Sequence, residues 1–161
     1  MGILNYTTEI AVETTILDIE KILAKGGADK ILKEYDGAGN ILAVSFMVKT
    51  EQGNLPFKLP MNAKAVLAVL NKQTEEYRST KSGRERVVPR KFYNDLEQAR
   101  KVGWRIIKDW LEAQMALYQL QMVKIQEIFL SYMIGIDGKT LYENLEQKGF
   151  KSYLLEDKHE N

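Results

Sequence analysis

The chain has 161 residues, 45% of them hydrophobic, which is enough for one domain to bury a core without help from a disulfide or a metal. It contains no cysteine, and its one histidine, His159, lies next to the chain end, so thiolate chemistry and an embedded imidazole are excluded. The net charge of +1 creates no overall field that would attract a nucleic acid or a membrane. We therefore expect a protein without catalytic activity and without a metal or cofactor.

The chain shows no signal for export or membrane insertion. Its N-terminus lacks a basic stretch followed by an apolar one, which a secretory signal would require. The longest uncharged run in the later part, residues 113–123, is far shorter than the roughly 20 apolar residues of a membrane span. These features predict a cytosolic protein with no membrane partner.

Residues 1–71 predict one helix followed by a β-meander. Apolar residues recur at helical spacing over residues 13–25, and Gly26-Gly27 is typical of a helix end. Residues 30–35 and 41–49 are rich in β-forming residues and flank a glycine-rich turn, which predicts a hairpin.

A third strand is expected at residues 55–60. Pro56 and Pro60 cannot donate to a ladder, so this strand belongs on a sheet edge or ends quickly. Asn62 then predicts the cap of a short helix that ends near Leu70.

The sequence predicts that residues 92–150 are mainly helical. A polar, mobile connector at residues 72–91 is expected to join them to residues 1–71. Asn94 is a candidate cap, with Glu97 three residues later, for a long helix over about residues 95–120. A further helix over residues 123–132 and a last one from Thr140 to Gly149 precede a frayed tail at 151–161. The expected buried stripe of the long helix comprises Ala99, Val102, Gly103, Ile106, Trp110, Ala113, Leu117 and Leu120. The whole is predicted to be one α+β domain, with a three-stranded antiparallel sheet packed against helices.

The connector holds the strongest local charge of the sequence. Residues 78–91 contain six cations against Glu85 alone, so their net charge is +5. Guanidinium groups suit phosphate oxygens and neighbouring rings suit bases, although an ordinary solvated loop explains the same pattern. The candidate ligand-binding residues here are Arg78, Arg84, Arg86, Arg90, Lys91 and Tyr93.

The first turns of the long helix add further candidates. Arg100, Trp104 and Lys108 share one face at a spacing of four residues, and Arg105 lies beside them. If the connector folds over this face, the two form one basic pocket that contains an indole. The alternative is that Trp104 belongs to the core and the cations cover its rim.

Residues 98–114 read Gln-Ala-Arg, Trp-Arg, Lys-Asp-Trp and Glu-Ala-Gln in succession, after a Leu-Pro-Phe-Lys-Leu-Pro stretch at 55–60. This arrangement resembles a family of small phage and prophage proteins. The resemblance implies a phage-type accessory protein in the cytosol of a bacterial host, and it implies no particular activity.

Three functions are compatible with these features. The first is binding of single-stranded nucleic acid, and the second is a sponge that sequesters a small cyclic nucleotide immune signal of the host. An extended strand would lose affinity steeply with salt, whereas a pocket for one or two phosphates would not. The third is a structural or partner-binding subunit, and a homo-oligomer is expected from the apolar surface of the long helix. Its contact surface would comprise Tyr118, Met122, Ile128, Phe129 and Tyr132.

Overall fold

A computed structural model of the chain describes residue 5 and residues 7–78 and 95–155, and it confirms the predicted α+β class. The strands form one antiparallel sheet in the order β1-β2-β3. The helices are α1 (Val12–Lys25), α2 (Ala63–Arg78), α3 (Leu96–Gln119), α4 (Ile125–Phe129) and α5 (Leu141–Gln147), with a 3₁₀ turn η2 (Leu130–Tyr132), and the strands are β1 (Ala28–Tyr35), β2 (Ile41–Thr50) and β3 (Gly53–Lys58).

The β-meander follows its predicted turns. The carboxylate of Asp36 accepts hydrogen bonds from the backbone N–H groups of Ala38 and Asn40, which closes the turn between β1 and β2. β3 is an edge strand, as its prolines predicted, and Pro56 lies opposite Met47 of β2. The outer side of β3 is partly covered, because the Pro56 carbonyl accepts a hydrogen bond of 2.8 Å from the Ile134 N–H.

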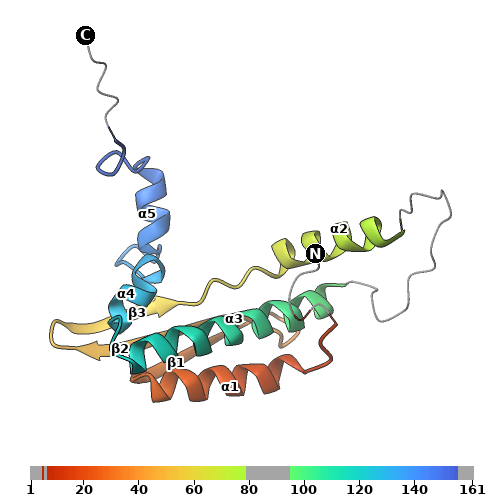
Figure 1. Cartoon of the computed structure of the whole chain (residues 1–161), viewed down its shortest axis with the longest axis horizontal. Coiled ribbons are helices and arrows are strands. Elements are labelled where there is room, and N and C mark those ends of the chain that lie inside the picture. The colour runs from red at the N-terminus through yellow and green to blue at the C-terminus, as the bar shows by residue number, and fades with distance from the viewer. Residues whose placement is uncertain (1–4, 6, 79–94, 156–161) are drawn as a thin grey trace, which may run out of the picture.

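One face of the sheet carries the main core. Side chains alternate along a strand, so Val44, Phe46 and Val48 of β2 point to the same face and are buried there. Helices α1 and α3 run side by side across the sheet in Figure 1, and both contribute buried side chains to the same cluster. Phe129 of α4 joins this cluster, with its ring centroid 5.0 Å from that of Phe46.

Helix α2 packs on α3 and makes a second, smaller core. Leu70 of α2 is buried against Ala99 and Val102 of α3. A Cβ at Gly103 would lie 3.3 Å from a methyl group of Val66 in α2 and 2.8 Å from the Met61 sulfur, so the glycine leaves room for both side chains. The helix is longer than predicted and runs through to Arg78, so residues 72–78 are helical rather than part of a connector. Once its first turns are packed, each added residue gains a backbone hydrogen bond at little nucleation cost.

Helix α3 differs from its prediction in two details. Its cap is Asp95 rather than Asn94, and the Asp95 carboxylate accepts a hydrogen bond of 2.7 Å from the Gln98 N–H. The buried residues of α3 match the prediction as far as Gly103, but beyond it they lie on a different face of the helix, toward the sheet. Ile106, Trp110 and Leu117 are only partly buried, Ala113 and Leu120 are exposed, and the buried residues are Ala99, Val102, Gly103, Trp104, Ile107, Leu111 and Met115.

The last part of the chain leads away from the helix–sheet body (Figure 1). The predicted helix over 123–132 is α4 followed by η2. As predicted, Thr140 caps the final helix, with its hydroxyl accepting from the Glu143 N–H and the Glu143 carboxylate accepting from the Thr140 N–H. Helix α5 packs mainly against η2, so much of its surface faces solvent.

Candidate functional site

The cations at the start of α3 are already paired with carboxylates. Arg100 lies 3.5 Å from Asp36 of the β1–β2 turn, and Arg105 lies 3.7 Å from Asp18 of α1. Lys108 contacts Glu112 at 2.6 Å, one helical turn further along α3. Three different elements therefore neutralise these cations, and the described residues do not bring them together on a common anion.

Trp104 belongs to the core. Its side chain is completely buried, within the cluster formed by α1, α3 and the sheet. An indole enclosed in this way offers no face on which a base could stack in this conformation. Its Nε1–H has no hydrogen-bond partner, so its position is determined by apolar packing.

The structure does not describe the side chains of the other predicted ligand-binding residues. Arg78 ends α2, and its side chain is not described. The remaining five lie outside the described residues, so their role stays a prediction: Arg84, Arg86, Arg90, Lys91 and Tyr93.

The carboxyl group of Asp36 is the clearest electrostatic feature of the sheet. A hydrogen bond from the Asn40 side chain is the largest cause that lowers its pKa, followed by the Asn40 backbone N–H. The charge of Arg100 lowers the pKa further, as a minor cause. The turn is thus held by an ionised aspartate, and Arg100 lies beside it.

Titration of Asp36 tests this assignment. Because its pKa in the folded chain is lowered, the ionised group stabilises the fold above its unfolded value of about 3.9, and this stabilisation is lost as the pH falls through the folded pKa. We expect its NMR titration midpoint to lie below that value. Asn40→Ala should raise the midpoint more than Arg100→Gln does. Equal midpoints in the wild type and Asn40→Ala would contradict the hydrogen-bond account.

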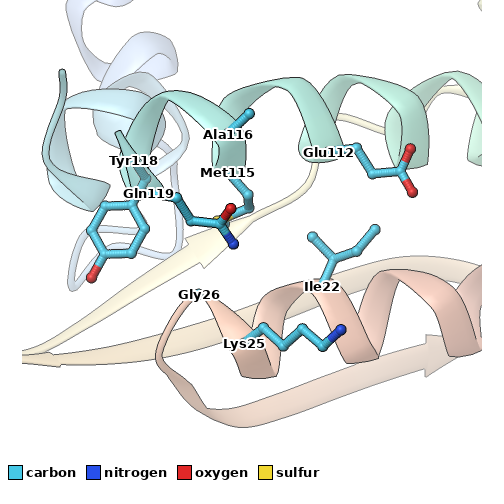
Figure 2. Close-up of a pocket in the computed structure, with 8 residues that line it drawn as sticks. All are labelled: Ile22, Lys25, Gly26, Glu112, Met115, Ala116, Tyr118 and Gln119. Carbon is cyan, nitrogen blue, oxygen red and sulfur yellow. The ribbon is translucent and has the colours of Figure 1, made fainter. Parts of the chain in front are cut away.

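The structure shows an apolar pocket between the end of α1 and the C-terminal half of α3. Its volume is about 160 Å³, and Figure 2 shows Ile22 and Lys25 of α1 facing Met115 and Glu112 of α3 across it. Gly26 sits at the junction, where a Cβ would lie 2.7 Å from the Met115 sulfur. The glycine therefore leaves room for the end of the Met115 side chain, which lines the pocket.

A wider depression adjoins this pocket. It has a volume of about 780 Å³ and lies between the β2–β3 turn and the segment that links α3 to α4. Gly26 and Tyr118 line both hollows, so we treat the two as one feature, the α1–α3 groove. Its apolar side chains include Ile22, Met115, Ala116, Tyr118, Met122 and Val123.

The turn that ends α3 directs apolar side chains to the groove. Gln121 has a φ of 57°, in the left-handed region that favours glycine, and the Met122 N–H donates to the Leu117 carbonyl at 3.0 Å. Met122, which lines the groove, is 66% exposed, and Leu120 beside it is 69% exposed. A non-glycine residue held in this conformation costs roughly 1 kcal/mol, and the apolar side chains around it remain open to solvent.

The groove contains only some of the residues of the apolar contact surface expected from the sequence. Tyr118 and Met122 are exposed and line it, as that expectation requires. Phe129 is completely buried, so its inclusion was wrong. Ile128 and Tyr132 are partly buried and pack on the core.

A second hollow, of about 550 Å³, lies between the end of β3 and α5. Its lining combines Tyr132 and Tyr142 with Lys58, Glu143 and Glu146. Charges of both signs line this hollow, as they line the α1–α3 groove. The α1–α3 groove is the stronger candidate site, because its 160 Å³ pocket is lined mainly by apolar side chains.

The chain is an α+β protein with an open groove whose smaller pocket is mainly apolar. Within the described ranges, no three acidic or histidine side chains are placed to hold a metal ion, and no helix is both long and apolar enough to cross a membrane. Comparison of the chain with protein-family models, with curated proteins and with solved structures found no match. The function must therefore be inferred from the geometry of the groove.

Proposed function

We propose that this protein is a non-catalytic binding subunit that holds an apolar segment of a polypeptide chain in the α1–α3 groove. The observation that carries this proposal is the 160 Å³ apolar pocket, which exposed Tyr118 lines, together with the adjoining depression, which exposed Met122 lines. An apolar cavity of about 150 Å³ is large enough for benzene, so this pocket has room for one leucine or phenylalanine side chain. A buried anchor of that kind is typical of protein–protein contacts.

The charges at the rim of the groove are of both signs. Lys25, Lys49 and Lys124 border the groove, and so do Glu51, Glu112 and Glu127. Among these acids, Glu112 pairs with Lys108 and Glu127 accepts from the Lys124 N–H. The proposal therefore rests on the apolar pocket and not on the charge of the partner.

Photo-crosslinking from the groove tests this function. Ala116 and Ala113 are both exposed alanines of α3, but only Ala116 lines the groove. A photoreactive phenylalanine analogue placed at 116, in cells that make the protein, should yield a discrete protein adduct that mass spectrometry identifies. The same analogue at 113 should yield far less. No adduct at 116, or equal adducts at both positions, would overturn the proposal.

Binding of single-stranded nucleic acid or a small nucleotide remains a second prediction, and so does the phage-type origin. Nucleic-acid or nucleotide binding now depends on the residues between α2 and α3, because the cations on α3 are paired. Charge reversal at Arg84, Arg86 and Arg90 separates the two functions. It should leave the adduct at 116 unchanged, whereas a nucleotide that copurifies with the wild type would be lost.

A further inference from the structure

We infer that β1 pairs antiparallel with β1 of a second copy of this chain, about a two-fold axis at Leu32, so that the two sheets join into one. This inference goes beyond the proposed function and concerns another surface. Of the described residues that line the α1–α3 groove, none belongs to β1. The homo-oligomer expected from the sequence would then form at the sheet edge rather than through the long helix.

β1 is an open edge of the sheet. It pairs with β2 on one side, and among the described residues no strand pairs with its other side. Backbone N–H and C=O groups along such an edge can pair with a strand of another chain. Every residue of β1 is exposed or partly exposed. Ile31 packs against the main core, so Leu32 beside it points to the opposite face of the sheet, where it is 62% exposed.

The side chains of β1 are self-complementary about Leu32. Register shifts lie on both sides of the stretch from Lys30 to Glu34, which pairs regularly with β2 and has Leu32 at its centre. Alternate side chains of a strand share a face, so Lys30 and Glu34 lie on the same face as Leu32. Antiparallel pairing about Leu32 therefore sets Lys30 of each copy opposite Glu34 of the other, and opposite charges in such cross-strand pairs are stabilising. The two Leu32 side chains meet between these pairs.

The neighbouring registers lack this match. A shift of one residue would set Lys30 opposite Lys33 and Asp29 opposite Glu34, and like charges directly opposite each other are destabilising. A shift in the other direction would set Lys30 opposite the uncharged Tyr35. The charges of β1 therefore favour the one register that is centred on the exposed leucine.

The lysines of β1 do not oppose this pairing, although lysines usually protect an edge strand from another chain. Lys33 contacts Glu20 of α1 at 2.6 Å, on the core side of the sheet. Lys30 is exposed and is in no ion pair among the described residues, so it is available to Glu34 of the second copy. Glu34 lies 4.0 Å from Lys58 of β3 and its side chain is 49% exposed, so its carboxylate can accept a second cation.

Disulfide trapping tests the position of the two-fold axis, since the natural chain has no cysteine. Leu32→Cys places a thiol opposite its own copy and should give a covalent dimer under mild oxidation. Tyr35→Cys is the matched control, because Tyr35 is similarly exposed in the same strand, but its two copies would lie about 20 Å apart. Equal yields from the two variants, or no covalent dimer of Leu32→Cys, would overturn the inference.

Sedimentation equilibrium at low salt gives a second readout. The wild type should associate to a dimer, and Lys30→Glu should raise the dissociation constant at least about tenfold, because both ion pairs become pairs of like charge. Lys30→Glu/Glu34→Lys restores opposite charges and should recover most of the affinity. Lys72→Glu reverses an exposed charge on α2 and should leave the dimer unchanged. A monomeric wild type, or a double variant as weak as Lys30→Glu alone, would overturn the inference.

Discussion

Replacing Trp104 with alanine is expected to lower the free energy of unfolding by about 3–5 kcal/mol, the usual cost of removing a large buried aromatic side chain. Trp104 is completely buried between α1, α3 and the sheet, so its loss leaves a cavity in the main core. Trp104→Phe should cost much less, because it also removes an indole N–H that has no partner. Urea denaturation followed by circular dichroism measures both changes.

Fluorescence supplies an independent check on the position of the indole. In a Trp110→Phe variant, Trp104 is the one remaining tryptophan of the chain. Its emission should be blue-shifted and poorly quenched by acrylamide, because solvent does not reach the ring. Strong quenching, together with an unchanged urea midpoint for Trp104→Ala, would contradict the core assignment and would restore Trp104 as a candidate ligand contact.

The local elements of this fold could be predicted because local signals specify them. The Gly26-Gly27 end of α1, the glycine-rich turn after β1 and the Thr140 cap of α5 each depend on residues next to one another in the sequence. Pro56 marked β3 as an edge strand for the same kind of reason. In each case the residue type constrains its own backbone, so no knowledge of the packing is needed.

The buried face of α3 could not be predicted so well, because the helix has two partners. Near its start, Ala99 and Val102 face α2, whereas Trp104, Ile107 and Leu111 face α1 and the sheet. Apolar residues therefore cover more than one stripe, and a single helical periodicity fits several choices of face. Only the tertiary arrangement decides between them.

The candidate site also could not be predicted from the sequence. Arg105 pairs with Asp18, and Arg100 pairs with Asp36, across long sequence separations that no local pattern reveals. The groove is lined by Gly26 and Met115, which are far apart in the sequence, and by Gln121, whose left-handed backbone no glycine indicated. Tyr118 and Met122 were recognised as apolar, but a hollow beside them follows only from how α1 and α3 end together.

Replacing Phe129 with alanine should also cost about 3–5 kcal/mol, although its neighbours in the chain are largely solvent-exposed. The Phe129 ring is completely buried and lies 5.0 Å from Phe46 and 5.8 Å from both Phe57 and Trp110, measured between ring centroids. Rings at these distances stabilise one another by roughly 0.5–1.5 kcal/mol beyond the area they bury. This one side chain therefore anchors α4 to the sheet.

The adjacent Leu130 provides the matched control, since it is about half exposed. Leu130→Ala should change the free energy of unfolding by less than about 0.5 kcal/mol, as expected for a surface position. Hydrogen exchange at the Ile134 amide locates the effect, because this amide is bonded to Pro56 only while the segment after η2 lies against β3. We expect fast exchange there in Phe129→Ala and slow exchange in Leu130→Ala. If the two variants exchange alike and unfold at the same urea concentration, Phe129 does not anchor α4 and the segment that follows it to the sheet.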